Sequence, residues 1–138
     1  MARKTILAVD DDPVVLEAIN EVFSAEYNIL LAKDGHEAID VANEQDVDLI
    51  LLDIMMPGFD GFSTLLLLKN SDKTKDIPVI MLTAVGKKEK IVVAFRDGAA
   101  GYVLKPFKED TLRSKIESII ADSEDKRKQS EGAQAPSE

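Results

Sequence analysis

Five short apolar runs, each followed by a segment of helical periodicity, constrain the fold of this chain more than any other feature. The apolar runs cover residues 5–9, 27–32, 48–52, 78–82 and 102–104. They are apolar on both faces, which is typical of parallel strands covered on both sides. Helical spacing of apolar residues follows at 13–23, 37–43, 61–70, 87–97 and 109–121. This alternation predicts an α/β fold in which helices cover both faces of a parallel sheet.

The composition fits one globular domain and excludes several classes of function. The chain has 138 residues, 45% of them hydrophobic, and no cysteine, so disulfides, thiolate metal sites and cysteine nucleophiles are excluded. A net charge of -9 argues against direct binding of nucleic acid. No apolar run approaches the ~20 residues of a membrane span, and the apolar stretch after Lys4 is too short for a signal peptide. We expect a cytoplasmic protein without a membrane partner.

The last part of the chain differs in composition from the rest. From Ser123 onward it is rich in charge, serine and glutamine and has no apolar anchor residues. Such segments cannot bury enough apolar surface to offset the cost of ordering. We therefore predict a domain over residues 1–122, followed by a disordered tail or the start of a linker over 123–138.

Polar side chains collect where the predicted strands end. Asp10 and Asp11 follow the first run, Asp53 the third, Thr83 the fourth and Lys105 the fifth. The carboxyl ends of parallel strands share one edge of the sheet, where ligands of such folds bind. If the first and third strands are neighbours, the three carboxylates converge. Without thiol or imidazole, they favour a hard cation, most plausibly Mg²⁺, beside which a phosphoryl group can contact Thr83 and Lys105.

A third carboxylate, Asp12, adjoins the first two and needs a separate explanation. At about 4 Å and an effective dielectric near 20, each like-charge pair costs about 4 kcal/mol. Asp12 precedes Pro13, a residue favoured at the first position of a helix. We therefore interpret Asp12 as the helix N-cap rather than as a metal ligand.

Four segments with this chemistry occur in a characteristic order. They are Asp10-Asp11, LLDIMMPGFDG at 51–61, MLTA at 81–84 and GAAGYVLKPF at 98–107. Together they resemble the receiver domain of two-component response regulators, over Lys4 to about Ala121. The resemblance implies a flavodoxin-like, doubly wound, five-stranded parallel sheet with five helices in three α/β/α layers. The strand order 2-1-3-4-5 is part of what the resemblance implies, because the residue pattern alone does not determine it.

The resemblance implies a role for each carboxylate. Asp53 is the phosphoacceptor, a nucleophile that takes a phosphoryl group from a phosphohistidine of a sensor histidine kinase or a phosphotransfer protein. Asp10, Asp11 and Asp53 hold Mg²⁺, and the backbone carbonyl of Met55 completes the protein ligands. The protein is thus expected to be a signalling switch and not an enzyme, apart from catalysing its own phosphotransfer and dephosphorylation.

The remaining implied roles concern the phosphoryl group and the response to it. The Thr83 hydroxyl and the Ala84 N–H contact the phosphoryl oxygens, and Lys105 pairs with their charge. The Lys105–Pro106 peptide is expected to be cis. Tyr102 is the switch side chain, whose rotamer follows the position of Thr83, so that phosphorylation changes a distant surface.

Two helices carry more apolar residues than one buried face requires. On a helical wheel Leu67 points away from the face that buries Leu65 and Leu68. In the segment 87–97, Ile91 and Phe95 are the favoured surface pair. We expect a downstream protein, or a second copy of the chain, to bind around Tyr102 and these residues.

An enzyme is a competing interpretation. The opening ILAVDDDP also resembles haloacid-dehalogenase-type phosphatases, with Asp10 as nucleophile and Asp12 as acid/base, and Thr83 and Lys105 fit further motifs of that family. Against it, the acidic pair expected on a loop after the lysine falls at the start of a helix. LLDIMMPGFDG would also have no explanation.

A binding scaffold and a flavin-binding protein are weaker candidates. An unphosphorylated binding scaffold would have a degenerate pocket, whereas all five pocket residues are present. Flavin binding would need hydroxyls and N–H donors after the first strand, where this chain has carboxylates.

Met55 and Val85, both apolar, flank the expected pocket and should position attacking water poorly, which favours slow loss of the phosphoryl group.

Overall fold

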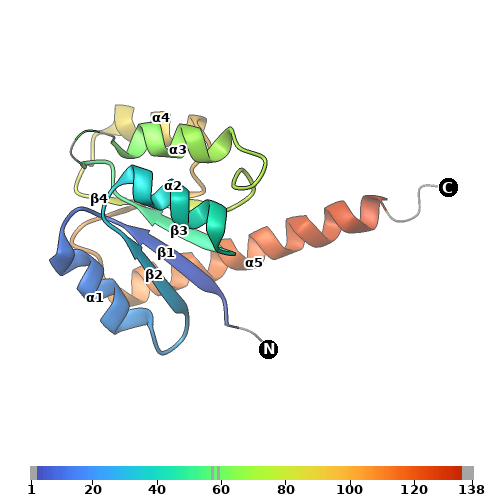
Figure 1. Cartoon of the computed structure of the whole chain (residues 1–138), viewed down its shortest axis with the longest axis horizontal. Coiled ribbons are helices and arrows are strands. Elements are labelled where there is room, and N and C mark those ends of the chain that lie inside the picture. Colours follow the sequence, from blue (N-terminus) through green and yellow to red (C-terminus); the bar gives the residue numbers. More distant parts are fainter. Residues whose placement is uncertain (1–2, 57, 59, 135–138) are drawn as a thin grey trace.

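A computed structural model of the chain describes residues 3–56, 58 and 60–134, the last eight of these as backbone only. Five strands form one parallel sheet in the order β2-β1-β3-β4-β5 (Figure 1). The strands are β1 (Thr5–Val9), β2 (Asn28–Ala32), β3 (Leu49–Leu52), β4 (Val79–Thr83) and β5 (Gly101–Leu104). The helices are α1 (Pro13–Phe23), α2 (Gly35–Glu44), α3 (Gly61–Lys69), α4 (Lys88–Arg96) and α5 (Glu109–Gln134). The predicted flavodoxin-like fold is confirmed.

Two apolar layers lie on opposite faces of the sheet. Residues that alternate along β1 show the division: Leu7 packs with residues of α2, α3 and α4, whereas Ile6 packs with residues of α1 and α5. All four residues of β3 are buried, as expected for a central strand covered on both faces. This burial fixes the register of β3 between β1 and β4, and with it the position of the residue that follows Leu52.

Aspartates cap three of the helices. Asp12, Asp34 and Asp60 each accept a backbone N–H of the first turn of α1, α2 and α3, respectively. The interpretation of Asp12 as an N-cap is thereby confirmed, with a distance of 2.9 Å from the Val14 nitrogen. Helix α4 differs, because its N-cap residue Lys87 makes no capping hydrogen bond with its side chain.

Helix α5 is longer than the sequence indicated. The predicted end near Ala121 is wrong, because the helix continues to Gln134 (Figure 1). Apolar anchors are not needed there, since glutamate, lysine, arginine and glutamine have high helix propensity. Oppositely charged residues also stand four positions apart, as at Asp122 and Lys126. The boundary between the domain and a tail stays a prediction, and residues 135–138 lie outside the described part.

Pro57, in the loop predicted after Asp53, also lies outside the described residues, as do Phe59 and the first two residues. Among the helices that the structure describes, none combines the length and apolar character needed to cross a membrane.

Candidate functional site

The carboxyl edge of the sheet brings the acidic residues together because β1 and β3 are neighbours. Asp10 follows β1, and Asp53 follows β3 and donates its backbone N–H to the Val9 carbonyl at 3.1 Å. Asp10, Asp11 and Asp53 each present a carboxylate oxygen, and these oxygens lie within 4.8 Å of one another. Asp10 and Asp53 are buried, whereas Asp11 is exposed. The convergence expected from the sequence is present.

Lys105 lies between two of these carboxylates. Its Nζ is 2.5 Å from Asp10 Oδ2 and 3.1 Å from Asp53 Oδ2. It comes from the residue after β5, at the far edge of the sheet, and its side chain spans β4 to reach the acids. One ammonium therefore contacts two of the three carboxylates, which leaves the cluster with net negative charge.

Backbone donors hold the second oxygen of each buried carboxylate in place. The N–H of Asp12 donates to Asp10 Oδ1 at 2.9 Å, and the N–H of Met55 donates to Asp53 Oδ1 at 3.3 Å. Each buried carboxylate thus has one oxygen oriented by the chain and one by Lys105. Such fixed geometry reduces the reorganisation that binding a cation or a phosphoryl group requires.

The pKa of Asp10 reflects the electrostatic cost of this arrangement. Burial, the largest influence, raises the pKa of Asp10 above its ordinary value, and the charge of Asp53 adds to the rise. The hydrogen bonds from Lys105 and from the Asp12 N–H lower it, but not enough to cancel the effect of burial. Burial, the largest single influence, would lower the pKa of Lys105, but its hydrogen bonds to the two aspartates and their negative charges together raise it.

The donor set fits a magnesium ion. It consists of carboxylate oxygens without nitrogen or sulfur, which suits a small hard cation. The backbone carbonyl of Met55 belongs to the loop that begins at Asp53, while its side chain is 65% exposed and points away from the core. A divalent cation would also offset the excess negative charge that Lys105 leaves uncompensated.

Thr83 and Tyr102 are connected through one residue of the loop after β4. Thr83 is fully buried, and its Oγ1 accepts the backbone N–H of Val85 at 3.3 Å. The Tyr102 hydroxyl donates to the Val85 carbonyl at 2.5 Å. This link through the backbone of Val85 was not predicted, because a backbone carbonyl that accepts a hydrogen bond leaves no signal in the sequence. Burial, and then the charge of Asp53, raises the pKa of Tyr102, so its hydroxyl stays a donor at neutral pH.

Gly61, the first residue of α3, packs directly on the backbone of the candidate phosphoacceptor. A Cβ atom there would lie 2.1 Å from the Asp53 carbonyl oxygen and 2.7 Å from the Ile54 Cα. The Gly61 N–H also donates to the Ile54 carbonyl at 3.0 Å. Only glycine permits this approach, and it holds α3 against the end of β3. Its importance for the site was missed, because a glycine at a helix start is common.

Comparison with known proteins agrees with this geometry. The model of the response regulator receiver domain family matches residues 6–117. The chain belongs to this family. Receiver domains are signalling components of two-component systems, so the chain is a signalling receiver.

The receiver is similar to parts of longer curated proteins. It is 34% identical over 116 residues to the DNA-binding dual master transcriptional regulator RpaA of Synechocystis, covering 83% of the chain and 48% of RpaA. It is 39% identical over 116 residues to the transcriptional regulatory protein CpxR of Escherichia coli, with the same coverage of 83% and 48%. The receiver therefore spans about half the length of the curated relatives it matches.

One similar solved structure is a receiver domain that contains a metal ion. The receiver domain of the sensor histidine kinase PA1611 from Pseudomonas aeruginosa has a TM-score of 0.80 and 30% identity, covering 87% of this chain and 99% of that one. That structure has a magnesium ion coordinated in its active site cleft.

The remaining predicted residues of this receiver lie around the site or on its surface. Ala84 is exposed next to Thr83, and the Lys105–Pro106 peptide is cis, the geometry that the resemblance implies. On α3, Leu67 is 50% exposed. On α4, Phe95 is 47% exposed and Ile91 is half-buried.

Proposed function

We propose that this receiver is a phosphorylation-dependent switch in which Asp53 accepts a phosphoryl group from a histidine kinase or a phosphotransfer protein. The observation that carries the proposal is the contact of Lys105 with two buried carboxylates, beside a third, at the edge next to Thr83. This arrangement has the positive and negative groups that phosphoryl transfer needs.

The proposed step is a direct transfer. An Asp53 carboxylate oxygen forms a bond to phosphorus as the bond between phosphorus and the donor imidazole nitrogen breaks, and the electron pair stays on the imidazole. Lys105 then pairs with the charge on the phosphoryl oxygens, and the Thr83 hydroxyl and the Ala84 N–H donate to them. When bound by Asp10, Asp11, Asp53 and the Met55 carbonyl, Mg²⁺ neutralises charge on the transferring group.

The response would pass through Val85. If Thr83 turns its hydroxyl toward a phosphoryl oxygen, it gives up the Val85 N–H, and the loop that also accepts the Tyr102 hydroxyl shifts. Tyr102 then settles in a different environment beside α4. We expect a downstream protein or a second copy to recognise the face around Tyr102 with Ile91 and Phe95, with Leu67 as a separate contact on α3.

The lifetime of the phosphoryl group should be long. Met55 and Val85 stand two residues after Asp53 and Thr83, and both are apolar, so neither side chain can orient a water for attack on phosphorus. RpaA and CpxR are named as transcriptional regulators. A transcriptional output for this receiver would need a DNA-binding domain or partner in addition to the matched residues 6–117. The cytoplasmic location of the receiver stays a prediction.

The test is to trap the phosphorylated residue. The protein is incubated with a histidine-phosphorylated kinase and Mg²⁺, quenched in acid, reduced with borohydride and mapped by peptide mass spectrometry. Modification of Asp53, lost in Asp53→Asn and retained in the control Asp12→Asn, is the expected result. Modification of Asp10, or steady turnover of an aryl phosphate, would instead support a phosphatase.

A further inference from the structure

A second concave surface opens beside the acidic cluster, between the loop after Asp53 and the start of α4. Its volume is about 700 Å³. Its apolar lining comes from three elements, namely the loop after β3, the first turn of α3 and the loop after β4: Ile54, Met55, Met56, Phe62 and Val85. The proposed phosphoryl contacts Thr83 and Lys105 are not part of this lining. We call this surface the α3–α4 groove.

The floor of the α3–α4 groove is preformed, and its mouth is adaptable. Ile54 and Met56 are only 5% and 7% exposed, so they belong to the packed core and cannot move far. Met55 is largely exposed at the edge of the groove. A flexible, polarisable methionine can adjust to apolar side chains of different shapes.

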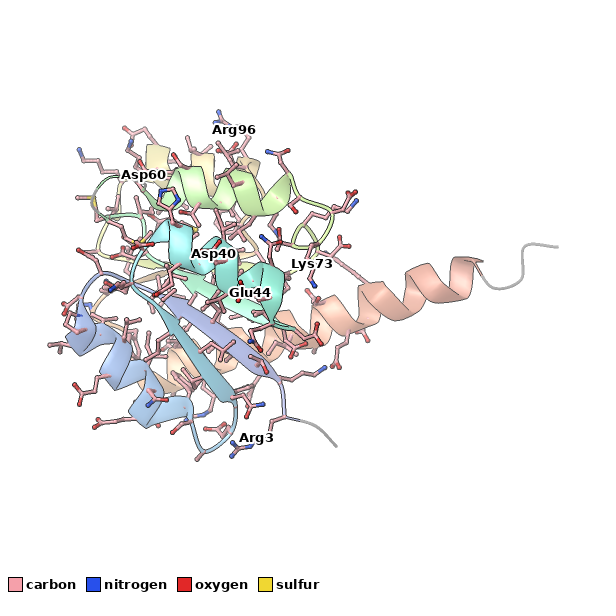
Figure 2. The ribbon with its side chains drawn as sticks, viewed as in Figure 1. Arg3, Asp40, Glu44, Asp60, Lys73 and Arg96 are labelled. Carbon is pink, nitrogen blue, oxygen red and sulfur yellow. The ribbon has the colours of Figure 1, made fainter. Side chains whose placement is uncertain are left out.

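The rim of the α3–α4 groove is positively charged. Lys87 and Lys90 line it, both are exposed, and neither forms an ion pair with any acidic residue that the structure describes. The Lys90 ammonium lies 5.7 Å from the centroid of the Phe62 ring, over the apolar lining. Asp60, which Figure 2 labels at the start of α3, also lines the groove, but it is engaged in accepting the Ser63 N–H at 2.9 Å.

This positive rim contrasts with the net charge of the chain, which is -9. Three lysines and one glutamate occupy positions 87–90, which gives this short segment a net charge of +2 (3 − 1). The positive end of the α4 dipole points the same way; no side chain caps it, although Glu89 in the first turn partly offsets it. An apolar floor with a cationic rim is complementary to an apolar side chain flanked by carboxylates.

We propose that the α3–α4 groove docks a short acidic segment of a partner protein, which inserts one large apolar side chain between Phe62 and Val85 and places carboxylates against Lys87 and Lys90. A nucleic acid would also meet the lysines, but it has no apolar side chain for this floor. Neither Tyr102 nor Phe95 is part of the lining, so the groove is distinct from the Tyr102 face. It exists in the unphosphorylated protein, so this inference does not depend on the proposed phosphotransfer.

The test uses synthetic peptides and the unphosphorylated full chain. The probe is a short peptide with one phenylalanine among leucine and glutamates, titrated into ¹⁵N-labelled protein and followed by NMR. We expect shifts centred on Phe62, Val85 and Lys90. The same peptide with alanine in place of phenylalanine should bind far more weakly, because the groove is left unfilled.

Two lysines on the same helical turn give a matched pair of variants. Lys90→Glu should weaken the peptide about fivefold, because a rim attraction becomes a repulsion. Lys88→Glu makes the same charge change outside the lining and should weaken it much less. A peptide with lysines in place of glutamates should bind Lys90→Glu better than it binds the natural protein.

Three results would overturn the docking proposal. They are equal effects of Lys88→Glu and Lys90→Glu, shifts centred on α1 or on the Tyr102 face, and tighter Lys90-dependent binding of a single-stranded oligonucleotide than of the acidic peptide. None of them bears on Asp53, whose phosphorylation is measured separately in the trapping experiment.

Discussion

The two edges of the sheet differ in how well their charged and polar groups are matched. At the amino edge polar groups are matched: Lys69 Nζ donates to the Lys75 and Ile77 carbonyls at 3.1 and 2.7 Å, and Asp48 Oδ2 accepts the Thr5 N–H at 2.8 Å. At the carboxyl edge Lys105 contacts two of three clustered carboxylates. Figure 2 labels Asp60 near the carboxyl edge and Lys73 on the opposite side of the globular part. The amino edge has matched polar groups, whereas the carboxyl edge keeps a net negative charge that a bound cation would offset.

This contrast indicates which changes should stabilise the fold and which should weaken it. Neutralising a matched charge removes a favourable contact, whereas neutralising a crowded, buried one relieves a cost. A change at the carboxyl edge is therefore best compared with a control elsewhere in the chain.

Gly61→Ala should have the largest effect on stability. Its Cβ would overlap the Asp53 carbonyl oxygen, and backbone cannot yield as a flexible side chain can. We expect a loss of about 3 kcal/mol in the free energy of unfolding, measured with urea. The control is Gly86→Ala, whose Cβ would meet only the Leu104 side chain, at 3.4 Å. An equally small change in both variants would show that α3 does not hold the site as described.

Lys105→Ala should slow phosphorylation of Asp53 by about 100-fold, because the fixed positive charge at the transferring group is lost. The rate is measured by stopped flow or rapid quench with a small phosphodonor in saturating Mg²⁺. Lys108→Ala, an exposed lysine three residues on, is the control and should leave the rate unchanged. If the two variants have similar rates, the contact between Lys105 and the acids has no part in the transfer.

Asp10→Asn should raise the free energy of unfolding at pH 7, by about 1 kcal/mol in a buffer with chelator. The folded state raises the pKa of Asp10 above 3.8, so it binds more protons than the unfolded chain between these two pKa values. Stability from this group is therefore present at low pH and is lost as pH rises through the raised pKa. The advantage of the variant should shrink as pH falls toward 4 and should reverse in Mg²⁺.

Asp48→Asn makes the same chemical change at the amino edge and should give no gain at any pH, since Asp48 accepts the Thr5 N–H. Equal gains from Asp10→Asn and Asp48→Asn would mean that the stabilisation comes from reduced net charge alone. That outcome would remove the distinction between the two edges.

The smallest effect is expected from the pair that ties α5 to the start of β1. Lys4 Nζ lies 2.7 Å from Glu124, and both side chains are partly exposed. Lys4→Ala should cost only about 0.5 kcal/mol, the usual value for an exposed ion pair, and less at high salt. A loss several times larger, persisting in salt, would mean that the amino edge depends on this contact far more than its exposure suggests.

The residue pattern was sufficient for the strands and for the polar residues that end them, whereas the strand order, and with it the convergence of the acids, came from the family resemblance. Buried strands such as β3 must be apolar on both faces, so the residues that end them, including Asp53, stand out against the pattern. The role of Asp12 as a helix N-cap was equally predictable, because Pro13 follows it. Local patterns of this kind determine both the element and the chemistry at its end.

What was not predicted depends on contacts between backbone atoms or on exposed side chains. The Val85 carbonyl, the approach of Gly61 to Asp53 and the rim lysines of the α3–α4 groove carry no periodicity that points to them. The end of α5 was misplaced because helix propensity continued after the apolar positions had stopped. In each case the information lies in three-dimensional proximity or in propensity, and not in the hydrophobic pattern.

The proposal that the carboxyl edge takes a cation and a phosphoryl group can be tested by the intact mass of the protein after incubation with acetyl phosphate, with Mg²⁺ or with chelator. We expect one added phosphoryl group in Mg²⁺, almost none in chelator, and none in Asp53→Asn under either condition. Equal phosphorylation with and without Mg²⁺, or phosphorylation that survives in Asp53→Asn, would contradict this description of the edge.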